Sequence, residues 1–252
     1  MTTEPGALAA IAPDLIDIST LFGPWPIASA DMTAASLLQL MARHGVKRAC
    51  TLSTLAVLLD AAIGNTATGA ACKEHSELVP ATSLDPTHLT ANAAAVRSLK
   101  QQGFRLLRFY PNIQGWPVTS VAFAGLAREA AAQGLPIAVQ VDRPGMVSDL
   151  ARTVGGTGDV ILVGIDLRLA TEAVAALADK PTWSIETSQL HATGLIAALA
   201  EQLGADRLVF GTGAPAQPVA AAATALLRAA LPPGDTQKIA AGNARRILKL
   251  DA

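Results

Sequence analysis

The sequence predicts an α/β fold, a single (β/α)8 TIM barrel with an extra C-terminal helix. Short apolar runs alternate with alanine-rich amphipathic stretches along all 252 residues, which is the pattern of βα units that build a parallel sheet. The apolar runs number eight, as many strands as close a TIM barrel. No linker interrupts the alternation. We therefore expect one domain over residues 1–252, with an N-terminal extension over 1–13 and the extra helix over 235–250.

The predicted strands are the apolar runs at 15–19, 48–53, 78–82, 105–110, 137–141, 160–164, 182–186 and 207–210. Helices are predicted between them at 33–44, 56–63, 90–101, 120–133, 147–154, 171–178, 193–203 and 218–229. Several of these stretches end at a glycine, as at Gly45 and Gly134, where a left-handed residue closes the last turn. The last helix follows Pro232-Pro233-Gly234 and is expected to pack against the outside or bottom of the barrel.

Composition argues against several classes of partner. The net charge is −1 and the basic residues are scattered, so nucleic-acid binding is not expected. The N-terminus lacks the positive region of a signal peptide, and no apolar run reaches the roughly 18 residues of a membrane span. Cys50 and Cys72 have no metal or redox spacing and are expected to be buried thiols. We expect a cytoplasmic protein with a small-molecule ligand and, by default, a homodimer.

Five segments carry a resemblance to a known family. They read DISTLFG at 17–23, GFRLLRFYP at 103–111, GLPIAVQ at 134–140, LGADRLVFGTGAP at 203–215 and GNARRIL at 242–248. In this order, and over almost the whole chain, they resemble the amidohydrolase-related TIM barrels. The resemblance implies a barrel enzyme of the kind that hydrolyses lactones or amides or removes carboxyl groups.

The resemblance also implies a set of metal ligands, and this chain has other residue types at those positions. The two strand 1 histidines, the strand 5 histidine, the strand 6 histidine and the strand 8 aspartate fall on Ser19, Leu21, Gln140, Gly164 and Gly213. Asp17 alone matches. A catalytic zinc takes about three donors from the protein, which leucine and glycine side chains cannot supply. We expect no metal and no cofactor, although the acidic residues leave a carboxylate site for Mg²⁺ or Ca²⁺ open.

Polar residues near the carboxyl ends of strands 4 to 7 form the predicted site, because TIM-barrel sites lie at that face. If Gln140 points inward, period-two alternation also turns Asp142 inward, and the same argument applies to Asp166. Asp142, Asp166 and Glu186 would then form an acidic arc facing Arg108. The candidate catalytic residues are Asp142, Glu186 and His191. The candidate substrate contacts are Arg108, Tyr110, Gln140, Arg143, Asp166 and Trp25.

Two interpretations of these residues remain open at this level. In the first, the chain is a metal-independent hydrolase or lyase, with a carboxylate or His191 for proton transfer and Arg108 as an anchor for a carboxylated substrate. In the second, the acids form ordinary ion pairs at the barrel rim, and the chain is an inactive relative that serves as a binding module or a non-catalytic subunit. A barrel mouth filled by Leu21 and Phe22 would favour the second.

Overall fold

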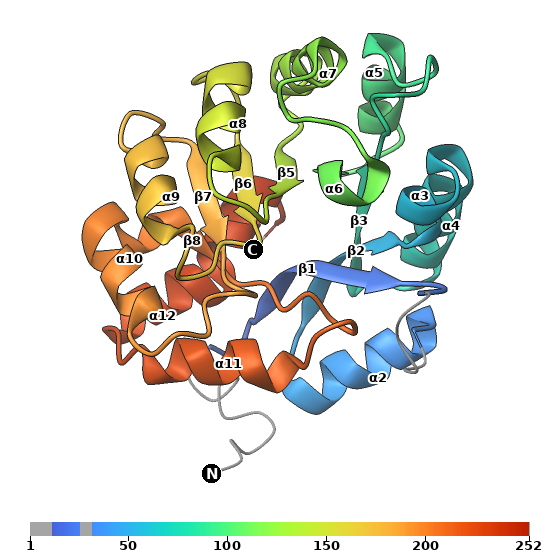
Figure 1. The fold of residues 1–252 in the computed structure, drawn as a ribbon. Helices are drawn as coiled ribbons and strands as arrows, with labels where there is room; N and C mark the ends of the chain where they lie inside the picture. Colours follow the sequence, from blue (N-terminus) through green and yellow to red (C-terminus); the bar gives the residue numbers. More distant parts are fainter. Residues whose placement is uncertain (1–11, 26–31, 252) are drawn as a thin grey trace.

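Eight parallel strands form one sheet in chain order in the computed structural model, which describes residues 12–25 and 32–251. The backbone N–H of Ile18 donates to the carbonyl of Phe210 at 3.0 Å, which joins the last strand to the first. Figure 1 shows the strands in the centre with the helices around them. The predicted (β/α)8 barrel is therefore confirmed. The strands are β1 Ile16–Phe22, β2 Arg48–Ser53, β3 Leu78–Ser83, β4 Leu106–Phe109, β5 Ile137–Gln140, β6 Val160–Val163, β7 Trp183–Glu186 and β8 Leu208–Val209.

The helices that follow the strands are α2 Ala34–His44, α3 Leu55–Leu58, α4 Ala61–Glu74, α5 Ala93–Gln101, α6 Pro111–Gln114, α7 Val121–Ala132, α8 Met146–Val154, α9 Ala170–Leu177, α10 Leu195–Leu203, α11 Val219–Arg228, α12 Pro233–Gln237 and α13 Asn243–Leu248. Gly45 and Gly134 have φ of +73° and +57°, as predicted for residues that end helices. Within the described part of the chain, no helix is long and apolar enough to cross a membrane.

Two stretches differ from the predicted helices. The helix expected at 56–63 is two helices, because the Asp60 side chain accepts a hydrogen bond from the N–H of Ile63 and starts α4. Gly64 allows the two to pack closely, since a Cβ there would lie 1.9 Å from the backbone nitrogen of Ala56. The last helix is also divided: a π-helical segment, Lys238–Gly242, separates α12 from α13. The N-terminal extension expected at 1–13 lies almost wholly outside the described residues.

Apolar side chains form two clusters, one on each side of the strands. The larger cluster packs the strands against the surrounding helices, as with Phe109 and Trp183. The smaller cluster contains inward residues of the strands, among them Ile16, Leu106 and Ile161, together with Ile247 of α13. Because α13 contacts β1 and β8, the C-terminal helix closes the amino end of the barrel, as expected. Polar side chains gather toward the opposite end.

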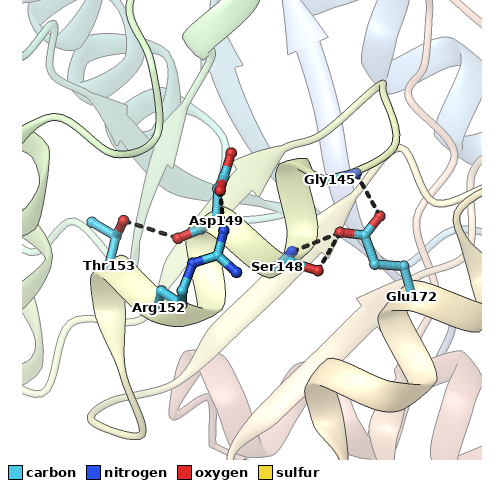
Figure 2. Close-up of polar contacts among 6 residues, drawn as sticks. All are labelled: Gly145, Ser148, Asp149, Arg152, Thr153 and Glu172. Atoms are coloured by element: carbon cyan, nitrogen blue, oxygen red, sulfur yellow. Dashed lines mark hydrogen bonds and ion pairs between the residues drawn. The ribbon is translucent and has the colours of Figure 1, made fainter.

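A carboxylate from a neighbouring helix fixes the start of α8. Gly145 precedes α8 and provides no side-chain cap. Glu172 of α9 supplies one: its two oxygens accept from the N–H groups of Gly145 and Ser148, at 2.9 and 2.7 Å, and from the Ser148 hydroxyl (Figure 2). Burial raises the pKa of Glu172, but these hydrogen bonds outweigh that effect and hold the pKa below its usual value. The loop between β5 and α8, which carries Asp142 and Arg143, is thereby held at its far end.

Candidate active site

Arg108 reaches across the interior of the barrel. It follows the inward Leu106 by two residues on β4, so alternation turns its side chain inward. Its Nη1 donates to the carbonyl of Thr20 at 2.8 Å and its Nη2 to the Ser19 hydroxyl at 3.1 Å, both on β1. The side chain is 4% exposed. Two of the five guanidinium donors are used, and Arg108 forms no ion pair with any described residue.

Glu186 is the last residue of β7 and is fully buried. Its Oε1 accepts from the N–H of Ser188 and its Oε2 from the Ser188 hydroxyl, both at 2.7 Å. Burial raises the pKa of Glu186 to about 7, and the nearby charge of Asp17 adds to this rise. The Ser188 bonds and the charge of Arg108 oppose it. A carboxyl group in this environment exchanges a proton near neutral pH.

Gly211 makes the space for Glu186. A Cβ at Gly211 would lie 2.1 Å from Glu186 Oε1, closer than real atoms approach. Only a residue without a side chain fits against the carboxyl group at this point. This packing role could not be predicted from the sequence, because no local pattern identifies the partner across the barrel.

Asp17 connects the first and last strands. It is 1% exposed and accepts from the N–H of Ser19 at 3.0 Å, from the N–H of Thr212 at 3.1 Å and from the Thr212 hydroxyl at 2.5 Å. Burial raises the pKa of Asp17 in spite of these bonds and of the charge of Arg108. Asp17, Arg108 and Glu186 interact electrostatically in the barrel interior. We call these three residues the lumen charge cluster.

Two buried hydroxyl groups beside Arg108 have no hydrogen-bond partner among the described residues. The ring of Tyr110 lies 5.4 Å from Arg108 Cζ, and its hydroxyl is unpaired. Ser83, fully buried, is the register partner of Arg108 on β3, and its hydroxyl is also unpaired. The side chain of Asn65 fixes Ser83 through bonds to its carbonyl and its N–H, at 2.9 and 3.0 Å. Ser83 is not among the site residues predicted from the sequence, although its spacing of two from the inward Ala81 indicates that it points inward.

The acidic arc expected from the sequence does not assemble as predicted. Asp142 and Asp166 have side chains 50% and 32% exposed, and they pair with Arg143 at 3.5 Å and Arg168 at 2.8 Å. Strands β5 and β6 end at Gln140 and Val163, so strand alternation does not extend to the two aspartates. Of the three predicted acids, only Glu186 faces Arg108.

Arg143 and Gln140 lie at the same rim. Arg143 also donates to Asn112 Oδ1 at 2.6 Å, so its head group belongs to a rim network and not to the lumen charge cluster. Gln140 is the last residue of β5 and is partly buried. These interactions match the rim ion pairs that the sequence left open as the alternative.

The remaining candidates lie apart from Glu186. His191 is exposed and lines a cavity of about 450 Å³ between α10 and α11, to which neither Glu186 nor Arg108 contributes. Trp25 is partly buried and packs on the inner apolar cluster, which also contains Leu21. Leu21 is 7% exposed, whereas Phe22 belongs to the outer cluster. Of the two residues expected to indicate a filled mouth, only Leu21 packs on the lumen side.

The side chains present do not fit a divalent metal. Five positions are those where the family resemblance implies ligands. Ser19 has a hydroxyl that is bonded to Arg108, Leu21 has an isobutyl group and Gln140 has an amide. Gly164 and Gly213 have no side chain. No three His, Cys, Asp or Glu residues converge on one point within residues 12–25 and 32–251. The guanidinium of Arg108 adds a positive charge beside the two buried acids. Zinc or manganese would need several anionic or imidazole donors in place of these groups.

The sequence profile of the amidohydrolase family matches residues 59–250, about three quarters of the chain. The chain therefore belongs to the amidohydrolase family. No curated protein is detectably similar to it in sequence.

Solved structures share the fold at low sequence identity. The 5-carboxyvanillate decarboxylase of Novosphingobium aromaticivorans, complexed with manganese and a nitrobenzoic acid, has a TM-score of 0.77 at 12% identity, covering 99% of this chain and 100% of that one. A dihydroxybenzoic acid decarboxylase from Polaromonas with bound manganese has a TM-score of 0.73 at 17% identity, over 95% and 98%. A probable 2-pyrone-4,6-dicarboxylic acid hydrolase from Acinetobacter baumannii, with citric acid bound, has 0.71 at 13%, over 94% and 99%.

Proposed function

We propose that this amidohydrolase-family protein is a metal-independent hydrolase or lyase that acts on a small carboxylated organic molecule. The observation that carries this proposal is Arg108, a buried cation with unused donors and no ion pair. A buried charge is costly unless a partner compensates for it. A substrate carboxylate matches the planar guanidinium and would supply that partner, with charge-assisted bonds.

Glu186 is the proposed proton-transfer group. A carboxyl group with a pKa of about 7 is present in both protonation states at neutral pH, which suits general acid or general base catalysis. In a hydrolysis ionised Glu186 would take a proton from water as its oxygen bonds to the acyl carbon, and would pass that proton to the leaving oxygen or nitrogen as its bond to the acyl carbon breaks. In a decarboxylation the carbon–carboxyl bond breaks, carbon dioxide leaves, and protonated Glu186 would return a proton to the carbon. The unpaired hydroxyl of Tyr110 is a further donor for the same ligand.

The structural neighbours support this class of substrate. Two of them are decarboxylases of aromatic acids and one is a hydrolase of a dicarboxylic acid. The manganese in the two decarboxylases argues for metal chemistry in those enzymes. The side chains of this chain argue against it here, because no histidine or carboxylate stands at the implied ligand positions and three of them, Leu21, Gly164 and Gly213, have no donor atom.

A second function, that of a non-catalytic carboxylate-binding relative, is favoured by the burial of the site. Glu186 is 0% exposed and Arg108 is 4% exposed, so both are almost wholly enclosed in this structure. Leu21 packs in the same inner apolar cluster as Tyr110. This function shares the proposed ligand with the first and differs only in turnover.

A single set of measurements separates the two functions. Protein freed of metal with a chelator is screened by thermal unfolding against aromatic mono- and dicarboxylic acids, and each hit is then incubated and assayed for carbon dioxide and hydrolysis products. We expect a ligand that stabilises the wild type and the control Arg207→Met, but not Arg108→Met. Arg207 is a suitable control because its guanidinium also donates to a backbone carbonyl, that of Trp183.

The outcomes have different meanings. Turnover that Glu186→Gln abolishes supports the enzyme, and binding without turnover supports the non-catalytic relative. Ligand binding that survives Arg108→Met contradicts the proposed site. Turnover that appears only after manganese is added contradicts metal independence.

A further inference from the structure

The guanidinium of Arg108 lies beside a position at which the family resemblance implies a metal ligand. This position is Ser19, whose hydroxyl accepts from Arg108 Nη2 at 3.1 Å. Arg108 therefore brings a positive charge to the point where strand 1 would otherwise present a ligand.

Two buried acids lie in the same part of the barrel interior as this cation. Asp17 is 1% exposed and Glu186 is 0% exposed. Asp17 accepts from the N–H of Ser19 at 3.0 Å, and the hydroxyl of the same Ser19 accepts from Arg108 at 3.1 Å. The charge of Arg108 lowers the pKa of both acids, against the larger effect of burial. Arg108 is the one buried cation among residues 12–25 and 32–251. Carboxylates removed from water need a counter-charge or a proton. No other described side chain supplies that charge.

We propose that Arg108 is the resident cation of this barrel: its guanidinium takes the place of a divalent metal beside Asp17 and Glu186 and excludes one. This inference rests on the metal independence of the proposed function and gives it a physical cause. A guanidinium that is part of the chain does not have to be taken up from solution as a metal ion does, but it cannot bind a hydroxide. The water-activating role of a metal is therefore absent, and the proton-transfer role falls to Glu186.

A purely structural role for Arg108 makes a different prediction. Its two bonds to β1 also brace the barrel from β4, and any variant that loses them loses the brace. Arg108→Lys keeps the charge on a compact head group that cannot form the same fork, whereas Arg108→Met removes the charge and keeps much of the length. If Arg108 excludes a metal by its charge, Arg108→Lys should therefore behave like the wild type. If Arg108 only braces the barrel, Arg108→Lys should behave like Arg108→Met.

The test is a manganese-binding measurement on folded protein without substrate. Wild type, Arg108→Lys, Arg108→Met, Arg108→Met/Glu186→Gln and the control Arg207→Met are dialysed against Mn²⁺. Bound metal is then counted, and thermal unfolding is compared with and without the ion. We expect no stoichiometric Mn²⁺ in the wild type, Arg108→Lys or Arg207→Met. Arg108→Met should bind Mn²⁺ at least about tenfold more tightly than the wild type, because a repelling unit charge is gone.

Adding Glu186→Gln should abolish this gain, because it removes one of the two carboxylates. One equivalent of Mn²⁺ in the wild type overturns the inference, as does an Arg108→Met variant whose Mn²⁺ affinity is unchanged or whose gain survives Glu186→Gln. If Arg108→Met does not fold, Arg108→Gln replaces it, since glutamine keeps a donor for Ser19 without the charge. Failure of the proposed function appears separately, as absent binding or turnover of carboxylic acids by the wild type.

Discussion

At the scale of single residues, the environment of Glu186 determines its chemistry. The side chain is enclosed by the barrel, so its ionised form is not hydrated. Ser188 donates to both of its oxygens, and no described cation lies within salt-bridge distance. Neutral and ionised states are therefore closer in energy than in water, and the pKa is about 7. The proton that makes Glu186 useful for catalysis also makes the folded state sensitive to pH.

We expect Glu186→Gln to flatten the pH dependence of stability. The ordinary pKa of this group is 4.5, and the folded protein raises it to about 7. Between these values Glu186 binds more protons in the folded state than in the unfolded state, so its contribution to stability is greatest below pH 4.5 and falls, by roughly 3 kcal/mol, as the pH rises to 7. Urea unfolding of both proteins across this range measures the difference. Parallel curves would contradict the raised pKa.

Gly211→Ala should displace Glu186 from its site. The added Cβ would overlap Oε1, so we expect a loss of about 1–3 kcal/mol in the free energy of unfolding and a loss of any Glu186-dependent turnover. Gly125→Ala in α7 is the matched control, because a Cβ there meets nothing within 4 Å and alanine stabilises a helix interior by about 0.5–1 kcal/mol. Equal stabilities of the two variants would show that the close approach is absent.

At the scale of elements, the start of α8 depends on a carboxylate from α9. Glu172 supplies the acceptor that Gly145 lacks, and its charge lies at the positive end of the helix (Figure 2). At the next turn the Asp149 carboxylate pairs with Arg152, and the backbone carbonyl of Asp149 accepts from the Thr153 hydroxyl. The loop before α8 carries the rim residues Asp142 and Arg143. Order in this loop therefore depends on contact between neighbouring helices.

Glu172→Ala should cost about 1 kcal/mol in the free energy of unfolding at neutral pH, the usual loss when a helix cap is removed. Because the folded pKa of Glu172 lies below 4.5, its contribution is complete above that value and is lost as the pH falls through the folded pKa. The wild type and the variant should thus converge in acid. Asp179→Asn, which alters an exposed acid paired with Lys180, serves as the control. A constant difference at all pH values would contradict the charge contribution.

At the scale of the whole molecule, the barrel is closed at its amino end by apolar packing and braced inside by polar contacts. Ile247 of α13 is 2% exposed within the inner apolar cluster, far in sequence from the strands it covers. Arg108 joins β4 to β1 across the interior. The amino end of the barrel is therefore sealed only when α13 packs against strands that precede it in the sequence.

Ile247→Ala tests the closure by α13. Truncation of a buried isoleucine usually costs about 2–5 kcal/mol, because a cavity remains where the methylenes were. Leu167→Ala is the control, since Leu167 is 65% exposed and its loss should change stability by less than about 0.5 kcal/mol. Denaturant unfolding followed by circular dichroism measures both. A cost for Ile247→Ala no larger than the control would mean that α13 does not seal the barrel.

The sequence by itself determined the barrel and placed the two central site residues near the carboxyl ends of predicted strands. Strand periodicity and glycine helix ends are local patterns, so they predicted all eight strands and most helices. Alternation along a strand also holds for Arg108 and Glu186, because each lies within a strand. The absence of metal-ligand residue types could likewise be read from the chain.

Only the tertiary structure decided which residues form the lumen charge cluster. Asp142 and Asp166 lie beyond the strand ends, where alternation no longer controls direction and solvent stabilises an exposed ion pair. The approach of Gly211 to Glu186, and the bonds from Arg108 to Ser19 and Thr20, join strands that are distant in sequence. These contacts depend on the three-dimensional closure of the barrel, which no local sequence pattern encodes.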